Sequence, residues 1–273
     1  MTKFVNRRIR NGLITIVTCL IILIILRVYG TPLYRMQIWS GWILFGLVIF
    51  LMLYNLKKKL PMLPLGSSAI WLQFHGYVGI ISMIMFLQHI NLRLPSGNFE
   101  ILFAILFILT ALTGVVGIIL SRVVPKYLTR TGEEVIFERI PIFTLQLRQQ
   151  VEALVLECAK ETGTVAMNDY YQKHLAEYFL GPRNVLFHLI ASNTPLYLMQ
   201  KKHATFCRYL NKKEKEFADE ILALVAKKND LDFHFALQGI LKAWGFLHVP
   251  LTYSLIVAAV VHVTLVYAFI GGV

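Results

Sequence analysis

Two apolar stretches that each begin and end with histidine decide the fold of this chain: His75–His89 (HGYVGIISMIMFLQH) and His248–His262 (HVPLTYSLIVAAVVH). In each stretch the two histidines are 14 residues apart. At about 100° per residue, 14 helical steps fall about 40° short of four full turns, so both histidines of a stretch lie on one face of a helix. At about 1.5 Å per residue they are about 21 Å apart along the helix axis. This distance places one histidine toward each side of a hydrocarbon core about 30 Å thick.

The rest of the chain is also rich in long apolar segments. Of the 273 residues, 57% are hydrophobic and 15% are charged, and the mean hydropathy is +0.63, whereas a soluble domain carries about 25% charged residues. A helix needs about 20 apolar residues to cross a bilayer. The segments of that length are 12–30, 37–55, 69–91, 101–120 and 245–270. The sequence therefore predicts an all-α membrane protein with five transmembrane helices.

The charge distribution predicts the orientation of these helices. The net charge is +12, but the segment 121–243 holds 17 basic and 14 acidic residues, which leaves 10 basic residues and one acid, Glu100, for the rest of the chain. The basic residues gather before the first apolar segment and after the second and fourth, and short loops rich in Lys and Arg stay in the cytoplasm. We expect a cytoplasmic N-terminus and an external C-terminus, in a bacterial inner membrane. No basic stripe with interleaved aromatic residues occurs, so we expect no nucleic-acid partner.

The same charge distribution divides the chain into three parts. Residues 1–120 hold the first four transmembrane helices, 121–243 form a mostly helical cytoplasmic domain, and 244–273 form the fifth transmembrane helix. Asp230 or Asp232 is the predicted cap of a helix that runs into this last span. Turn residues and hydrophobic periodicity predict a short hairpin followed by three helices within the cytoplasmic domain, over 129–139, 145–161, 165–179 and 212–228.

The direction of the helices determines how the four histidines pair. The third and fifth predicted helices both run from inside to outside, so His75 and His248 share the inner depth, and His89 and His262 share the outer depth. Two imidazoles that face each other at one depth can occupy both axial positions of a haem iron. We therefore predict two haems b in a four-helix bundle core. His75 and His248 would be the ligands of the inner iron, and His89 and His262 those of the outer iron.

Three alternatives to haem ligation stay open for these histidines. The first is that they are polar residues bonded to neighbouring helices, although ionisable groups inside a membrane are rare and usually functional. The second is a zinc or copper site, which requires ligands within about 2 Å of one ion, whereas the two histidines of one helix are about 21 Å apart. The third is a proton relay, although no Asp or Glu lies within the predicted spans.

Glycines and basic residues near the histidines fit the same prediction. Glycine lets membrane helices approach closely or leaves room for a bulky group, and ordinary helix packing accounts for these glycines equally well. They are Gly41, Gly76, Gly79, Gly114 and Gly117. Basic residues at the ends of the spans are candidate partners of haem propionates, although topology and headgroup contact also account for them. They are Arg122, Lys126 and Lys242 on the inner side and Arg27, Arg35 and Arg93 on the outer side.

The cysteines and the remaining histidines show no recognised metal motif. No C-x-x-C pair is present, which argues against covalent haem, a thiolate zinc site and an iron–sulfur cluster. We expect the cysteines to be buried, unreactive thiols and the other histidines to be ordinary residues of the cytoplasmic domain. These residues are Cys19, Cys158 and Cys207, and His174, His188, His203 and His234.

The two quoted stretches resemble the haem-binding helices of dihaem membrane cytochrome b. Paired histidines at this spacing on two helices mark cytochrome b of the quinol-oxidising cytochrome bc complexes. Ferric-reductase-like transmembrane proteins and NADPH oxidases use the same device on their third and fifth helices. The resemblance covers the transmembrane part and implies the haem ligands named above. The chain departs from both families, because it has no Pro-Glu-Trp-Tyr stretch, no G-x-G-x-x-G fingerprint and an insertion, 121–243, unlike either.

These features predict electron transfer across the membrane by a cytochrome b subunit of an oxidoreductase, linked to the quinone pool. Membrane lipid and redox partner subunits, cytoplasmic or external, are the expected partners, so the chain is an electron-transfer subunit rather than a complete enzyme. Tyr77, Tyr253 and Ser254 are candidate quinone contacts, although buried packing is their commoner role. The alternatives are a protein that handles or transports haem or a metal, a ferric-reductase-like protein with a separate reductase partner, and a structural anchor for the cytoplasmic domain.

Overall fold

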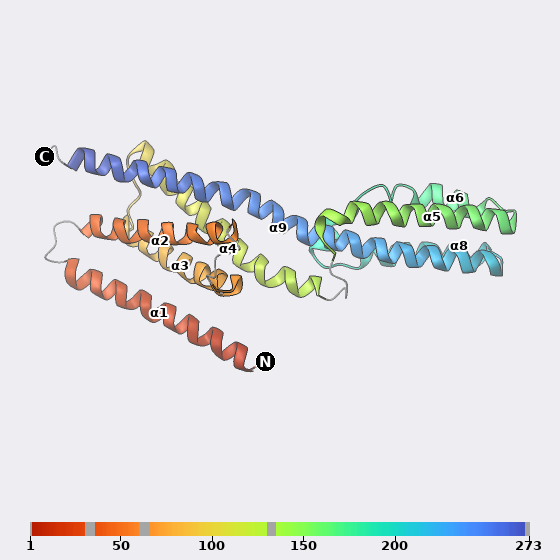
Figure 1. Cartoon of the computed structure of the whole chain (residues 1–273), viewed down its shortest axis with the longest axis horizontal. Helices are drawn as coiled ribbons and strands as arrows, with labels where there is room; N and C mark the ends of the chain where they lie inside the picture. Colours follow the sequence, from red (N-terminus) through yellow and green to blue (C-terminus); the bar gives the residue numbers. More distant parts are fainter. Residues whose placement is uncertain (1, 31–35, 60–65, 130–134, 271–273) are drawn as a thin grey trace. The chain divides into compact units, whose positions relative to one another are not determined.

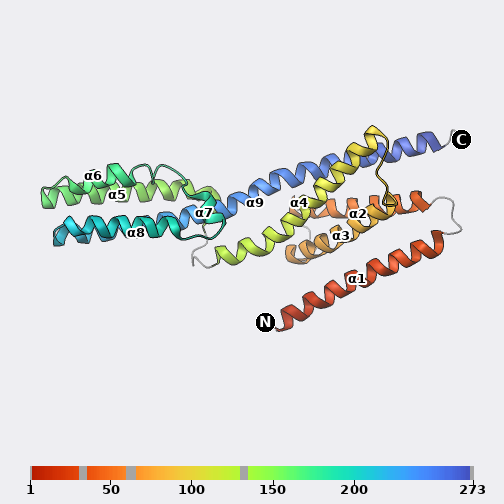
Figure 2. The same cartoon turned by 180° about the vertical axis from the view of Figure 1, so that it is seen from behind.

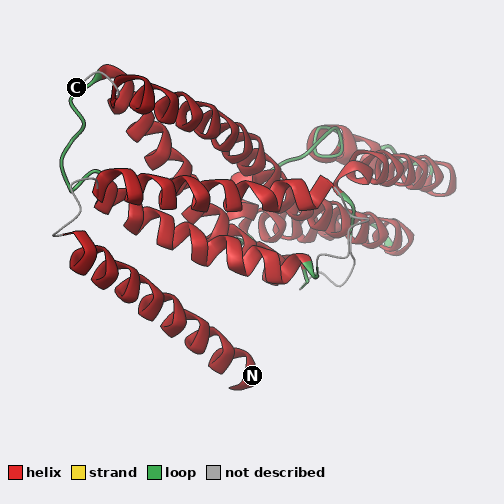
Figure 3. Cartoon of the chain, turned by 60° about the vertical axis from the view of Figure 1, so that its left-hand side comes forward, coloured by secondary structure: helices red, strands yellow, loops and turns green. Residues whose placement is uncertain are grey.

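The protein is helical throughout the described part of the chain. A computed structural model describes residues 2–30, 36–59, 66–129 and 135–270, and in these it contains helices and connecting turns but no strand (Figure 1, Figure 3). The all-α prediction is thereby confirmed for these residues. The hairpin predicted over 129–139 is wrong for its described part. Phe137–Arg139 is a turn of 3-10 helix, and it leads directly into a helix that begins at Ile140 with Pro141 in its first turn, where the fixed φ of proline suits a helix. Residues 130–134 lie outside the described residues.

The chain divides into two compact units. The bundle unit consists of residues 1–119 and 244–273, and the insertion unit consists of residues 120–243. The predicted limits of the cytoplasmic domain, 121 and 243, lie within one residue of this division. Two helices, α4 (Asn98–Leu128) and α9 (Lys212–Ile270), contribute residues to both units.

The bundle unit contains helices of the length and apolar character that a membrane requires. It is built from α1 (Thr2–Gly30), α2 (Met36–Lys59), α3 (Ser68–His89) and parts of α4 and α9. Four of these helices, α2, α3, α4 and α9, are long and apolar enough to cross a bilayer, and they mark the chain as a membrane protein. In α1 the apolar stretch found among the described residues, Ile9–Ile22, is shorter. The fifth span therefore stays a prediction.

Apolar packing joins the helices of the bundle unit. Helices α2 and α3 lie side by side (Figure 2), and Phe86 of α3 stacks on Phe107 of α4, with ring centres 4.2 Å apart. Val48 of α2 and Leu255 of α9 belong to the same cluster. Many other apolar side chains of these helices point outward, for example Leu102, which is 64% exposed. Outward apolar residues are the expected surface of a helix bundle surrounded by lipid.

Helix α3 begins and ends at defined residues, and these limits place its two histidines. Ser67 caps its first turn, because the Ser67 side chain accepts a hydrogen bond from the backbone N–H of Ile70 and so satisfies one of the unpaired N–H groups there. The helix ends at His89, and the chain then turns through Asn91 and Leu92, which have positive φ angles of 51° and 53°. His75 thus lies two turns inside α3, and His89 is its last residue.

The insertion unit packs four further helical segments against the first half of α9. They are α5 (Ile140–Thr162), α6 (Ala166–Tyr170), α7 (Val185–Leu189) and α8 (Thr194–Phe206). Val151 and Val155 of α5 share a buried core with Ile221 and Val225 of α9. The helix predicted over 145–161 is confirmed within α5, and Gly163, with φ of 67°, ends it. Only the beginning of the helix predicted over 165–179 is regular, because a π-helical turn follows α6.

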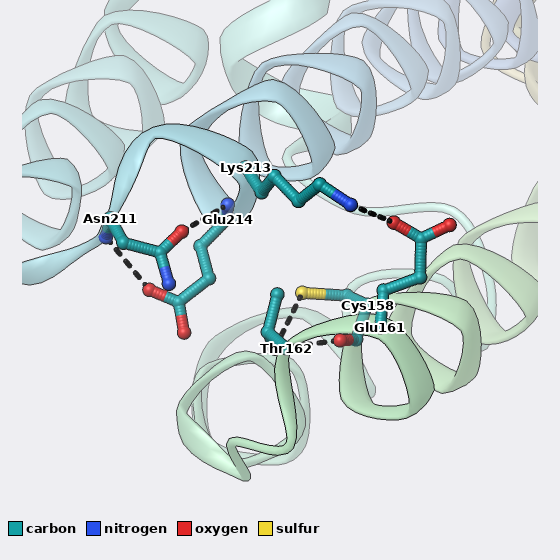
Figure 4. Close-up of polar contacts among 6 residues, drawn as sticks. All are labelled: Cys158, Glu161, Thr162, Asn211, Lys213 and Glu214. Carbon is teal, nitrogen blue, oxygen red and sulfur yellow. Dashed lines mark hydrogen bonds and ion pairs between the residues drawn. The ribbon is translucent and has the colours of Figure 1, made fainter.

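Figure 4 shows how the start of α9 is fixed beside the end of α5. The backbone N–H of Asn211 donates to the carboxylate of Glu214 at 2.8 Å, and the backbone N–H of Glu214 donates to the side-chain oxygen of Asn211 at 2.9 Å. This reciprocal pair is a capping box, and it satisfies two N–H groups that the first turn of a helix leaves unpaired. Lys213 then forms an ion pair with Glu161 at the end of α5, with 3.3 Å between nitrogen and oxygen.

Helix α9 continues past the cap predicted at Asp230 or Asp232, and that prediction is wrong. The carboxylate of Asp232 accepts hydrogen bonds at 2.5 and 2.6 Å from Lys228, one turn earlier in the same helix. Its side chain is therefore not available to cap a backbone N–H. The Lys228 ammonium also donates to the carbonyl of Gly181 at 2.9 Å, and the side chains of Lys228 and Asp232 are 0% and 2% exposed. Through the bond from Lys228 to Gly181, the pair connects α9 to the loop that follows the π-helical turn.

Removing one member of this buried pair is expected to destabilise the insertion unit. We expect Lys228→Met to lower the free energy of unfolding by about 3–5 kcal/mol, because it leaves the Asp232 carboxylate buried without its partner. Combining Lys228→Met with Asp232→Leu should restore most of this loss, because no buried charge remains. Pulsed proteolysis in urea, with cleavage followed within residues 121–243, measures both values. Lys227→Met, at the exposed neighbouring position, is the control. A double variant as unstable as the single one would contradict the expectation.

Candidate functional site

The four histidines of the two quoted stretches meet as two pairs inside the bundle unit. Helix α3 carries His75 and His89, and α9 carries His248 and His262. The ring centres of His75 and His248 are 6.4 Å apart, with their planes at 82°. Those of His89 and His262 are also 6.4 Å apart, with their planes at 87°. Both pairs that the sequence predicts are brought together, so α3 and α9 run in the same direction.

The separation of the rings suits a metal ion between them. With a metal–nitrogen bond of about 2.0 Å and a ring centre about 1.1 Å behind the nitrogen, two imidazoles on opposite sides of one iron have centres about 6.2 Å apart. The observed 6.4 Å agrees with this value. Direct packing of two rings also gives centre distances of about 4.5–7 Å. The hydrogen bonds of the ring nitrogens bear on which nitrogen could bind a metal.

The ring of His75 is oriented by a backbone carbonyl. Its Nδ1 atom lies 3.2 Å from the carbonyl oxygen of Leu51 in α2. A carbonyl oxygen only accepts hydrogen bonds, so Nδ1 carries the proton of the neutral ring, and Nε2 is the unprotonated nitrogen. Metal-binding histidines show this arrangement, in which one ring N–H donates to a carbonyl or carboxylate while the other nitrogen binds the metal.

Two hydroxyl groups lie at hydrogen-bond distance from Nδ1 of His248 and Nδ1 of His89. Nδ1 of His248 lies 2.9 Å from the hydroxyl of Thr113, which can also donate to the backbone carbonyl of Leu109 or Thr110. Nδ1 of His89 lies 3.2 Å from the hydroxyl of Ser40. A hydroxyl that donates to a carbonyl accepts from the imidazole, and in that arrangement Nδ1 carries the ring proton and Nε2 is unprotonated.

The Ser40 hydroxyl donates to the backbone carbonyl of Gln37 at 3.0 Å, which leaves it able to accept from Nδ1 of His89.

His262 is oriented differently, by aromatic contacts. Its ring centre lies 5.2 Å from that of Phe103 and 6.4 Å from that of Phe99, both in α4. Three of the four rings thus have an oxygen partner at Nδ1, and the fourth is held by aromatic contacts. Sequence reasoning did not find these supporting residues, because they lie on other helices.

Two of the predicted glycines lie directly against histidine rings. A Cβ atom added at Gly41 would lie 3.0 Å from Cε1 of His89, and one added at Gly114 would lie 3.5 Å from Cε1 of His248. The first distance is shorter than ordinary van der Waals contact, so any larger residue at Gly41 would displace the imidazole. These glycines allow α2 and α4 to approach the histidine pairs closely.

The other predicted glycines have different surroundings. A Cβ atom added at Gly117 would overlap the indole of Trp244, and this indole donates to the carbonyl of Thr113 at 2.7 Å. A Cβ atom added at Gly76 would lie 3.5 Å from Cδ1 of Ile118, which is ordinary contact. Apart from the nearby part of its own helix, no described residue has an atom within 4 Å of a Cβ atom added at Gly79. Gly117 therefore supports the site through Trp244, whose ring stacks on His248 with 5.1 Å between centres.

A cavity opens beside the His75–His248 pair. It is partly open to its surroundings, and its wall is mostly apolar. Apart from the two histidines, its polar side chains are hydroxyls that each donate to a backbone carbonyl: Ser82, Thr110 and Thr252. Helices α2, α3, α4 and α9 all contribute to its wall. An apolar wall with a few polar side chains is typical of ligand and cofactor sites.

The remaining predicted contacts lie elsewhere or outside the described residues. Tyr77, Tyr253 and Ser254 are not among the residues that line this cavity. Arg93 is exposed after the end of α3, and Arg122 and Lys126 are exposed near the end of α4. Lys242 donates to Glu138 within the insertion unit, and this bond holds the pKa of Glu138 below its ordinary value. Arg35 and the side chain of Arg27 lie outside the described residues.

Comparisons of the chain with models of known protein families, with curated protein sequences and with solved structures found no match. The resemblance to dihaem cytochrome b therefore stays a prediction, and a function for this protein is inferred from its own side chains.

Filling the space at Gly117 is expected to disturb the site through Trp244. We expect Gly117→Ala to destabilise the bundle unit by about 1–3 kcal/mol, because the new methyl group forces the indole to move. Thermal unfolding in detergent, followed by near-ultraviolet circular dichroism of tryptophan, measures the loss. Gly46→Ala is the matched control, because a Cβ atom at Gly46 meets nothing within 4 Å. Equal melting temperatures for the two variants would show that Trp244 does not pack as described.

Proposed function

We propose that this protein carries electrons across a membrane through two haems b, each held between α3 and α9 by two histidines. His75 and His248 would bind one iron, and His89 and His262 the other. The observation that carries the proposal is the combination of ring separation and the oxygen partners of Nδ1. Both pairs have ring centres 6.4 Å apart, and Nδ1 of His75, His248 and His89 each lies at hydrogen-bond distance from an oxygen of a neighbouring helix, an arrangement that would leave Nε2 to bind a metal.

The residues of the bundle unit fit a haem in their chemistry. Two neutral imidazoles are a common axial pair for iron, and haem bound in this way supplies a group that is reversibly oxidised and reduced by one electron. The apolar wall beside His75 and His248 would exclude water from the macrocycle. The glycines at 41 and 114 leave no side chain between the histidine rings and the neighbouring helices.

The protein's own part in this function is to position and insulate the cofactors. Leu51, Ser40 and Thr113 hold the imidazoles by their Nδ1–H groups, which fixes the ring orientation and makes each ring a stronger donor to a metal. The two ligands on α3 are 14 residues apart, about 21 Å along a helix. The two sites would therefore lie toward opposite sides of the hydrocarbon core.

The surroundings of this electron path complete the proposal. Under the positive-inside rule, α1 is a fifth span, the N-terminus and the insertion unit are cytoplasmic, and the C-terminus is external. The insertion unit is then the surface on which a cytoplasmic redox subunit would dock. The link to the quinone pool rests on the resemblance to cytochrome b alone, because Tyr77, Tyr253 and Ser254 do not line the described cavity.

The proposal predicts two tightly bound haems per chain. Protein purified from cells supplied with haem should show two haems b by pyridine haemochrome, and His75→Ala and His89→Ala should each remove one of them. The crossed ring planes, at 82° and 87°, also predict highly anisotropic low-spin ferric signals in electron paramagnetic resonance. His174→Ala, at an exposed position of the insertion unit, is the control. Protein without haem would refute the proposal, and substoichiometric, exchangeable haem would favour a haem-handling protein.

The hydrogen bond from His248 to Thr113 should influence one haem more than the other. We expect Thr113→Val to raise the midpoint potential of the haem held by His75 and His248 by roughly 20–60 mV, since an imidazole without its acceptor donates less to iron and a lost hydrogen bond is worth about 0.5–1.5 kcal/mol. Spectroscopic redox titration resolves the two haems. Thr264→Val, which removes a hydroxyl bonded to the carbonyl of Val260, should leave both potentials unchanged. Equal shifts in both variants would exclude a specific role for Thr113.

A further inference from the structure

The insertion unit contains a second group of residues with metal-binding side chains. His203 lies near the end of α8, Cys207 follows one turn later, and Asp219 projects from the first turns of α9. Nε2 of His203 is 3.5 Å from Sγ of Cys207 and 3.6 Å from a carboxylate oxygen of Asp219. One ligand atom from each of the three residues lies within 4.8 Å of the other two.

These separations match those around a tetrahedral ion. With metal bonds of about 2.0 Å to nitrogen, 2.3 Å to sulfur and 2.0–2.2 Å to oxygen, the ligand atoms of a tetrahedral zinc site are about 3.3–3.7 Å apart. The two distances measured from His203 fall within this range. Imidazole and thiolate together favour zinc over magnesium or calcium, which take oxygen ligands.

The charges and hydrogen bonds at this place are compatible with a divalent cation. A thiolate at Cys207 and the carboxylate of Asp219 together carry two negative charges, which one Zn²⁺ would neutralise. Nε2 of His203 lies 3.0 Å from the carbonyl of Ala218, a bond that the metal would replace. That carbonyl lies inside α9 and keeps its helical N–H partner.

We propose that His203, Cys207 and Asp219 bind one zinc ion, with water in the fourth position. Three protein ligands with one open position are the arrangement of zinc sites that bind or activate a further ligand. The ion would also join the end of α8 to the beginning of α9 across the short connection between them. Sequence reasoning treated His203 and Cys207 as ordinary domain residues, because the third ligand lies on a different helix and no recognised motif contains all three.

The test is a zinc count on the whole 273-residue chain, purified in detergent. Equilibrium dialysis against buffered zinc, followed by elemental analysis of zinc and iron, should give one zinc per chain. We expect Cys207→Ser and Asp219→Asn each to weaken zinc binding by at least about tenfold, since even the loss of a residue that only supports a ligand costs about 10–100-fold. Glu220→Gln is the matched control, because Glu220 is the exposed neighbour of Asp219 on α9 and should bind zinc unchanged.

A second measurement covers the chance that Cys207→Ser unfolds the insertion unit. Asp219 is 71% exposed at its side chain, so Asp219→Asn should fold normally and decides the matter on its own. Zinc should also slow the reaction of Cys207 with a maleimide, measured by mass spectrometry of the labelled peptide. The proposal would be overturned if the unaltered protein bound no zinc. It would also be overturned if the Asp219→Asn variant bound zinc with the same affinity as the unaltered protein. Iron is counted separately, so the result is independent of whether the bundle unit binds haem.

Discussion

A histidine ring has two nitrogens, and in apolar surroundings each of them needs a partner. The bundle unit meets this requirement for Nδ1 of His75, His89 and His248 with a carbonyl and two hydroxyls from α2 and α4. The neighbouring helices must therefore approach the rings closely, which explains why glycines stand at positions 41 and 114. These contacts join α3 to α2 and α9 to α4.

The pairing of the histidines could be predicted from the sequence because it depends on two regular quantities. One is the helical repeat, which places residues 14 apart on one face, and the other is the distribution of Lys and Arg, from which α3 and α9 were predicted to be parallel. The helical repeat and the charge distribution are properties of whole helices. The predicted pairing therefore does not depend on the exact residue at which each helix begins or ends. The predicted glycines at 41 and 114 were found for a related reason, since small residues in apolar spans mark close approach.

The supporting contacts could not be predicted, because they join residues that are distant in the sequence. Leu51 supplies a backbone carbonyl, which any residue type offers, and Ser40 and Thr113 are two hydroxyls among many. The predicted cap at Asp230 or Asp232 failed for a similar reason. The carboxylate of Asp232 is used by Lys228 one turn earlier, and a buried ion pair at this spacing continues a helix that a capping residue would begin.

In the proposed function, the spacing of 14 residues between the histidines of α3 also has an electrical consequence. An electron that moved between two haems about 21 Å apart would cross about seven tenths of a hydrocarbon core about 30 Å thick. Each transfer would then exchange about 1.6 kcal/mol with the membrane for every 100 mV of potential, since a full crossing is worth about 2.3 kcal/mol. Because Nδ1 of His75 is committed to the carbonyl of Leu51, no proton on that ring is available to follow the electron and cancel this charge movement. In the proposed function, the length of one helical segment therefore sets how strongly electron flow and membrane voltage oppose or drive each other.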